Sequence, residues 1–154
     1  MDFDAIAQQC APLVAPATAR ALIAVESGFA PWAIHVQGGE LESQPASKKE
    51  AIATASALRI AGWDFDLGLA QINVKNVQYF GLKLAQAFDP CTNLQLMQRI
   101  LMDCFVRARA SDARGQTALR EALACYNTGN LQEGIARGYV GRVIRAARRQ
   151  AHGP

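Results

Sequence analysis

Glu26 is the side chain best placed to do chemistry. It ends the apolar stretch at 21–25, and Gly28 stops the segment two residues later. Helical spacing puts Glu26 on the same face as Leu22 and Val25, at the edge of a buried stripe. Burial and the negative end of the helix dipole both raise a carboxyl pKa, which suits a general acid near neutral pH. Taken alone, an exposed glutamate at a helix end is the simpler interpretation.

Two later stretches carry polar side chains beside glycines. Gln71 and Asn73 follow a glycine turn among apolar residues, and Tyr126 and Asn127 precede Gly129. Amides on a rigid turn can orient a sugar hydroxyl or N-acetyl group, because they both donate and accept hydrogen bonds. A tyrosine hydroxyl within reach of a carboxylate can fix it and tune its pKa. The alternatives are an ordinary polar turn and a core tyrosine.

The segments that must position these residues are mainly helical. Pro16 fits a first helical turn and Gly28 a helix end, Ser47 has capping-box spacing to Glu50, and Asp89 can cap the best helix of the chain. Residues 35–46 read as a loop or small hairpin and 63–69 as an extended segment. Expected helices cover about 4–9, 16–27, 48–61, 71–80, 90–110, 117–128 (capped by Thr117) and 138–149. We expect one mainly α domain, 1–154, with a small β-hairpin or extended segment and a basic tail over about 142–154.

Composition excludes some classes. The chain has 154 residues, of which 51% are hydrophobic and 19% charged, and a net charge of +3. No apolar run approaches the ~20 residues of a membrane span. The arginines gather at the C-terminus rather than on a recognition helix, so we expect no nucleic acid. We assign His35 to structure, and with His152 it makes no metal pair, so we expect no metal and no cofactor.

The four cysteines are widely spaced, without a zinc pattern. Cys104 and Cys125 lie at similar distances from the turn at 111–116, so antiparallel helices would bring them to the same level. We therefore expect a Cys104–Cys125 disulfide and, by elimination, Cys10–Cys91. The N-terminus lacks a secretory signal. The chain is therefore either a cytoplasmic protein with four unpaired cysteines or a mature region whose signal peptide is not in this chain.

Three motifs stand out: Glu26-Ser27, the stretch 68–73 with Gln71 and Asn73, and the stretch 126–129 with Tyr126 and Asn127. Together they resemble the soluble lytic transglycosylase family, which shares the goose-type lysozyme fold. The resemblance covers roughly residues 5–145. It is closest to the subgroup that accompanies type IV secretion systems, and the segments that carry this closer similarity are 9–12, 88–91, 103–105, 125–126 and 138–140.

The resemblance implies a lysozyme-like helical bundle around a sugar-binding cleft. It also implies a periplasmic enzyme that cleaves the β-1,4 bond between N-acetylmuramic acid and N-acetylglucosamine in peptidoglycan and leaves a 1,6-anhydro ring. Glu26 falls on the single catalytic acid/base. The substrate-binding positions are Ser27, Gln71, Asn73, Tyr126, Asn127 and Tyr139. The expected partners are the glycan strand and other secretion components, and the expected state is a monomer.

Two alternatives remain open. Asp64 and Asp66 lie just before the glycine turn, and a second carboxylate facing the sugar would permit hydrolysis, as in a muramidase. The chain could instead be a non-catalytic wall-binding or scaffold module of the secretion apparatus. Retention of Glu26, Gln71 and Tyr126 argues against a pure scaffold.

Overall fold

The computed structural model describes residues 2–151, the last of these by its backbone alone. Helices predominate, and three short strands form an antiparallel sheet in the order β1-β2-β3. The expected mainly α fold with a small β element is therefore confirmed. The elements in chain order are α1 (Phe3–Cys10), α2 (Pro16–Ser27), β1 (Ile34–Val36), α3 (Lys48–Ile60), β2 (Phe65–Leu67), β3 (Ile72–Asn73), α4 (Val74–Tyr79), α5 (Leu84–Phe88), α6 (Pro90–Ala110), α7 (Gly115–Thr128), α8 (Glu133–Ala136) and α9 (Tyr139–Ala151).

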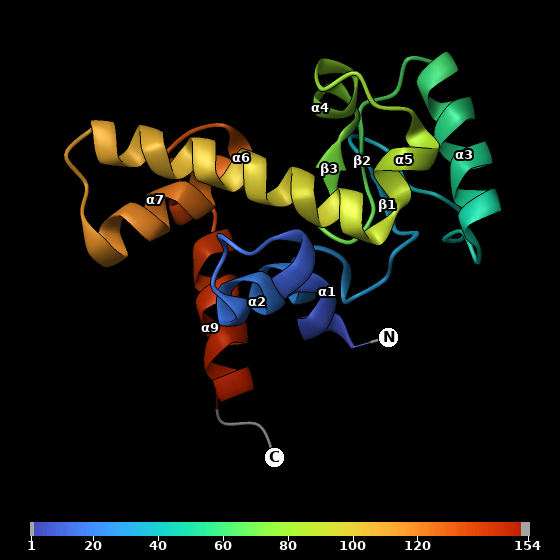
Figure 1. Cartoon of the computed structure of the whole chain (residues 1–154). Coiled ribbons are helices and arrows are strands. Elements are labelled where there is room, and N and C mark those ends of the chain that lie inside the picture. The colour runs from blue at the N-terminus through green and yellow to red at the C-terminus, as the bar shows by residue number, and fades with distance from the viewer. Residues whose placement is uncertain (1, 152–154) are drawn as a thin grey trace.

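The elements form three groups around the long helix α6. The sheet lies with α3, α4 and α5 near one end of α6, and α7 packs along its other half (Figure 1). Helices α1, α2 and α9 form the third group, in which α9 packs against α2. The largest hydrophobic core runs through all three groups, from Leu22 and Phe65 to Met97 and Val143.

Local signals set most helix ends. Pro16 occupies the first turn of α2, and Gly28 ends it in the left-handed conformation at φ 60°. The Ser47 hydroxyl accepts from the Glu50 N–H at the start of α3, and the Asp89 carboxylate accepts from the Thr92 N–H at the start of α6. These caps satisfy backbone donors that a helix leaves free at its first turn.

Two expected helix starts were wrong, and of the two alternatives for 35–46 the loop is present over 37–46 and the hairpin is not. Helix α4 begins at Val74 rather than Gln71, because Ile72 and Asn73 pair with β2 as strand β3 and Asn73 then caps the helix. Helix α7 begins at Gly115, so Thr117 lies inside its first turn and caps nothing. Strand β1 pairs with β2 across the intervening α3 instead of closing a hairpin within 35–46. The end of the basic tail, with His152, lies outside the described residues.

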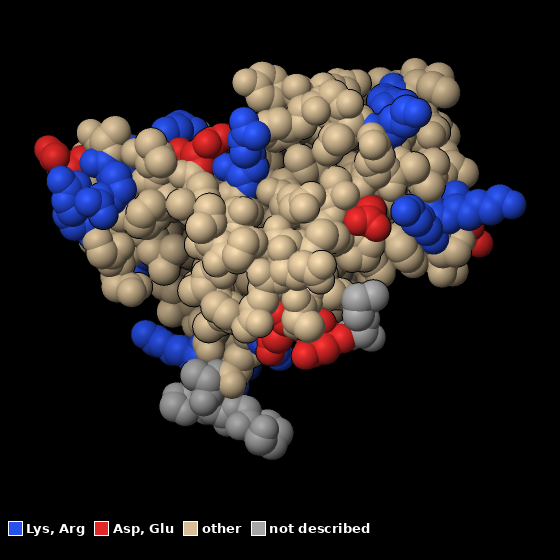
Figure 2. All heavy atoms as spheres, viewed as in Figure 1, with Lys and Arg blue, Asp and Glu red and all other residues tan. Residues whose placement is uncertain are grey.

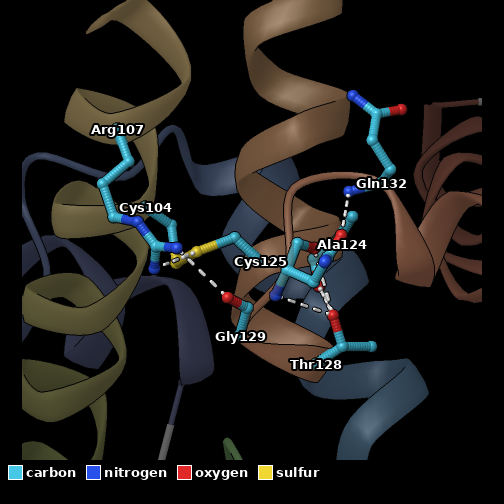
Figure 3. Close-up of a disulfide and its surroundings, with 8 residues drawn as sticks. Cys104, Arg107, Ala124, Cys125, Thr128, Gly129 and Gln132 are labelled. Atoms are coloured by element: carbon cyan, nitrogen blue, oxygen red, sulfur yellow. Dashed lines mark hydrogen bonds between the residues drawn. A yellow bond between two sulfur atoms is a disulfide. The ribbon is translucent and has the colours of Figure 1, made fainter. Parts of the chain in front are cut away.

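Both expected disulfides are present. Cys10–Cys91 joins α1 to the start of α6, and Cys104–Cys125 joins α6 to α7. The α6–α7 bridge closes the helical hairpin beside the cleft described below (Figure 3).

Asn93 is a fully buried polar side chain that ties the sheet to the helices. Its Nδ2 donates to the carbonyl oxygens of Leu67 (3.1 Å) and Ala87 (2.9 Å), and its Oδ1 accepts from the Ala70 N–H (2.8 Å). Gly68 has φ 82°, and a Cβ there would lie 2.3 Å from Asn93 Nδ2. One side chain of α6 therefore holds the turn that carries Gln71, and only glycine fits beside it.

Replacing Asn93 should destabilise the protein strongly. Asn93→Leu leaves two carbonyl oxygens and one N–H buried without partners, so we expect the free energy of unfolding to fall by roughly 3–5 kcal/mol. Urea denaturation measures this. Gln95→Ala, an exposed change on the same helix, serves as the control and should have little effect. A loss no larger than that of Gln95→Ala would show that the Asn93 bonds do not hold the fold.

Candidate active site

The Glu26 carboxyl lies where two hollows meet. The larger one, here the main cleft, has a volume of about 570 Å³, and the smaller one, the side pocket, about 380 Å³. Glu26 and Gln71 line both. A chain molecule that runs from the main cleft into the side pocket must pass these two side chains.

Three groups of elements build the walls of the main cleft. The sheet and its neighbouring turn form the first wall, here the sheet wall, and the C-terminal half of α6 with the end of α7 and α8 forms the opposite one, here the helical wall. Helix α4 adds aromatic rings at the rim, where Tyr79 is 81% exposed and packs edge-on against Phe80. Exposed aromatic faces beside polar groups are suited to binding sugar rings.

The structure brings most of the expected site residues together. Glu26, Gln71, Asn73, Tyr126 and Asn127 line the main cleft, although they come from three distant segments. Ser27 lines the side pocket instead, and its hydroxyl donates to the Ile23 carbonyl oxygen within α2 (3.4 Å). Tyr139 does not line either hollow and is buried behind Glu26, with 2% of its surface exposed.

The surroundings of Glu26 raise the pKa of its carboxyl. The residue is partly open to the cleft but otherwise enclosed by protein, and this desolvation raises its pKa from 4.5 to about 7. The nearby hydroxyl of Tyr139 works in the opposite direction, the negative charge of Asp66 raises the pKa further, and the positive charge of Arg142 lowers it. The effect of burial is the largest of the four, so the pKa of Glu26 is raised overall. The expected elevated carboxyl is present.

The two tyrosines differ from expectation in their roles. The single O–H of Tyr126 is donated to the Ala70 carbonyl oxygen (2.7 Å), so it ties α7 to the glycine turn instead of bonding the carboxyl. The hydroxyl of Tyr139 is the one beside Glu26, in a contact looser than a well-formed hydrogen bond, because the described residues offer it no partner of good geometry. Burial raises the pKa of both phenols, so both keep their protons.

The side-chain amides of Asn73 and Gln71, which we expected to orient a sugar, make hydrogen bonds within the protein. Both hydrogens of the Asn73 amide are donated to carboxylates, to Asp64 (2.7 Å) and Asp66 (2.9 Å), and its oxygen accepts from the Lys75 N–H. Asn73 thus organises the acidic side chains of the sheet. Gln71 has φ 52°, and its side-chain Nε2 donates to the carbonyl oxygens of Ala33 and Gly68 (3.0 Å each). The side-chain oxygen of Gln71, which lines the cleft, is left free to accept.

Asp66 supplies a second carboxyl in the same cleft. It faces Asn73 across the sheet, and Gln37 also donates to it (2.9 Å). Burial raises the pKa of Asp66, while the hydrogen bond from Asn73 and the nearby His35 lower it. His35 lies 3.9 Å from Asp66. Among the described residues, no cluster of three or more histidine, cysteine or acidic side chains is arranged to hold a metal.

Sequence comparison agrees with this geometry. The Transglycosylase SLT domain model matches residues 4–147. The chain belongs to the SLT transglycosylase domain family. The resemblance inferred from the three motifs is therefore confirmed.

Of three similar curated proteins, one is named as a secretion protein, and the other two are named virB1 alone. The type IV secretion system protein virB1 of Brucella abortus biovar 1 is 48% identical over 151 residues, which cover 94% of this chain and 63% of the relative. Protein virB1 of Agrobacterium fabrum (strain C58) is 36% identical over 148 residues, with coverage of 95% and 59%. Protein virB1 of Rhizobium radiobacter is 37% identical over 148 residues, with coverage of 95% and 61%. This SLT chain spans about three fifths of the length of these relatives. No solved structure gives a significant match.

Three features of the main cleft and its support were not predicted from the sequence. They are the rim aromatics Tyr79 and Phe80, the arginines Arg107 and Arg137, and the buried clamp Asn93. Only Asn93 offered a signal, as a polar residue on the apolar stripe of the best helix. No helix within 2–151 is long and apolar enough to cross a bilayer.

The raised pKa of Glu26 predicts how stability depends on pH. The folded carboxyl holds its proton up to about pH 7 and the unfolded one only to its ordinary 4.5, so the wild type loses stability as pH rises between these values. Glu26→Gln lacks this loss. Its stability relative to wild type should therefore grow from pH 4.5 to pH 8, by about 1–3 kcal/mol given the partial opening to the cleft.

Urea unfolding at several pH values tests this prediction. Glu40→Gln, in the exposed part of the 37–46 segment, is the matched control and should show no such trend. A constant difference between wild type and Glu26→Gln across this range would contradict the raised pKa.

Proposed function

We propose that this chain is a peptidoglycan lytic transglycosylase in which Glu26 is the single acid/base. The observation that supports this most is the protonated Glu26 carboxyl at the junction of the main cleft and the side pocket, where a glycan threaded through both would present a glycosidic bond. SLT family membership supports the reaction class. A protonated acid at this point can donate to a leaving oxygen at neutral pH.

The reaction needs one carboxyl used twice. Glu26 gives its proton to the glycosidic oxygen as the bond from the anomeric carbon of the muramic acid breaks. The resulting carboxylate removes the proton from the 6-hydroxyl of the same sugar, whose oxygen then attacks the anomeric carbon and closes a 1,6-anhydro ring. Glu26 ends protonated and no water is consumed. Tyr139 lies where it stabilises the carboxylate between the two steps, since its O–H already lowers the pKa of Glu26.

The neighbouring residues hold the reacting sugar. The free carbonyl oxygen of Gln71 accepts a hydroxyl or N-acetyl N–H, and the Asn127 amide lines the same cleft. Ser27 contributes to the side pocket. Asn73, Tyr126 and Tyr139 act by positioning, because their strongest contacts are with the protein.

The proposed setting is the periplasm, at a type IV secretion apparatus. The relatives named as type IV secretion proteins support this role, and two disulfides fit an oxidising compartment. Local opening of the cell wall would make room for such an apparatus. We propose the peptidoglycan glycan strand as the substrate and secretion components as partners.

Glu26→Gln should abolish the release of anhydro-muropeptides from purified cell wall. Gln keeps the shape but cannot donate a proton to the leaving oxygen, so we expect a fall of about 10²–10⁴-fold. In the wild type the rate should decline as pH rises through about 7, where Glu26 loses its proton. Mass spectrometry of the products and circular dichroism of the variant are the measurements, with Glu40→Gln as the control. Activity within a few fold of wild type would remove Glu26 from the mechanism.

Hydrolysis is the second candidate, because Asp66 lies in the same cleft and its charge reaches Glu26. A carboxylate there could activate a water as in inverting glycosidases. Asp66→Asn separates the two reactions. Under transglycosylation anhydro ends persist, and the alkaline fall in rate moves to lower pH because a charge that raises the Glu26 pKa is gone. Under hydrolysis the wild-type products carry reducing ends, and Asp66→Asn stops their formation.

A further inference from the structure

Arg107 is a cation held at a fixed place on the helical wall of the main cleft. It comes from α6 and reaches across to the end of α7, where its Nη2 donates to the Gly129 carbonyl oxygen (3.2 Å) and its Nη1 lies 3.2 Å from Cys125 Sγ (Figure 3). The Cys104–Cys125 disulfide fixes the two helices beneath it. A guanidinium held at two points loses less freedom when it binds a ligand.

The guanidinium still has hydrogens to give. Arginine carries five N–H donors in a planar fork, and two of them are engaged by α7. Within residues 2–151 no carboxylate lies within ion-pair distance of Arg107, although Asp103 is one turn earlier on the same helix. The other arginine of this wall, Arg137, is paired with Glu133 at 3.7 Å. Arg107 is therefore the cation of this wall that remains open to an anion.

The charges of the main cleft differ from wall to wall. The sheet wall carries Asp64 and Asp66, with Lys75 Nζ 3.9 Å from Asp64 and the His35 ring 3.9 Å from Asp66. The helical wall carries Arg107 and Arg137 with Asp103 and Glu133. An anionic group on a ligand is repelled from the sheet wall and finds its open partner at Arg107. On the face seen in Figure 2, basic side chains gather over the α6–α7 turn and around α3.

Arg107 is also close enough to the reacting sugar to matter. The two α7 residues that it contacts, Cys125 and Gly129, flank Tyr126, whose pKa is raised first by burial and then by the charge of Glu26. Arg107 therefore contacts α7 within one turn of Tyr126, and both line the main cleft together with Glu26. A peptide carried by a sugar bound at Glu26 would extend along this same cleft.

We propose that Arg107 binds a carboxylate of the stem peptide that muramic acid carries, and so directs the peptide-bearing sugar toward the helical wall. This inference rests on the proposed function, because it names the part of the same substrate that the cleft selects. Peptidoglycan stems contain free carboxylates, and a guanidinium fork matches a carboxylate with two parallel hydrogen bonds. A stem whose carboxylates are amidated offers the same bulk without the charge.

The test measures binding with Glu26→Gln protein, so that no substrate is consumed. The probes are two glycan fragments of equal length, one with free stem carboxylates and one with the same stems amidated. By calorimetry we expect the acidic fragment to bind about tenfold more tightly, a ratio that falls with added salt. Adding Arg107→Gln should bring the ratio to about one. Adding Arg109→Gln, an exposed arginine on the same helix that does not line the cleft, should leave it near tenfold.

Two outcomes overturn the inference. If Arg107→Gln weakens both fragments equally and the ratio persists, Arg107 acts only by joining α6 to α7. If the Glu26→Gln protein binds both fragments alike from the start, the cleft does not read the stem charge. A protein that binds the acidic fragment selectively while wild type releases no muropeptides would refute the proposed function and leave the stem contact standing. Thermal unfolding of each variant separates folding defects from binding defects.

Discussion

The hydrogen bonds of Asn93 are the constraint on which the site depends. Three groups on two segments, Leu67 and Ala70 around the glycine turn and Ala87 in α5, converge on one amide buried in α6. A buried amide of this kind must have every partner in place, since each unmet group costs about 1–3 kcal/mol. The turn thus has one conformation, and Gln71 is held at the junction of the two hollows. Tyr126 closes the same turn from α7 through the Ala70 carbonyl oxygen.

Placing the Glu26 carboxyl in a largely enclosed position lowers the stability of the protein when that carboxyl ionises. Burial that lifts its pKa to about 7 also makes its ionised form destabilising, so function and stability pull apart at this residue. Neighbouring groups moderate the conflict: Tyr139 and Arg142 favour the charged form, and both come from α9. The C-terminal helix therefore does more than cover α2. It sets how readily the carboxyl gives up and regains a proton.

The sequence predicted what depends on nearby residues. Pro16, Gly28 and Asp89 act within one turn of their own positions, so the ends of α2 and the start of α6 were correct. The Cys104–Cys125 disulfide was predicted because its cysteines lie at similar distances from the turn between α6 and α7, and Cys10–Cys91 followed by elimination. Strand β3, the donor role of Asn73 and the exchange of roles between Tyr126 and Tyr139 were missed. Each depends on a partner far along the chain, and no local pattern encodes which donor meets which acceptor.

Helix α6 links these parts into one working cleft. Near its start Cys91 ties it to α1 and Asn93 fixes the sheet wall, and near its end Cys104 and Arg107 fix the helical wall. Asn93 and Arg107 are separated by about 21 Å of continuous helix, at 1.5 Å per residue. Because both walls are attached to one continuous helix, their separation is set by that helix together with the turn that Asn93 holds in one conformation. The two carboxyls of the cleft are thus attached to different elements: Asn73 and Gln37 bond Asp66 to the sheet wall, while Glu26 lies near the end of α2, where Tyr139 and Arg142 of α9 tune its pKa.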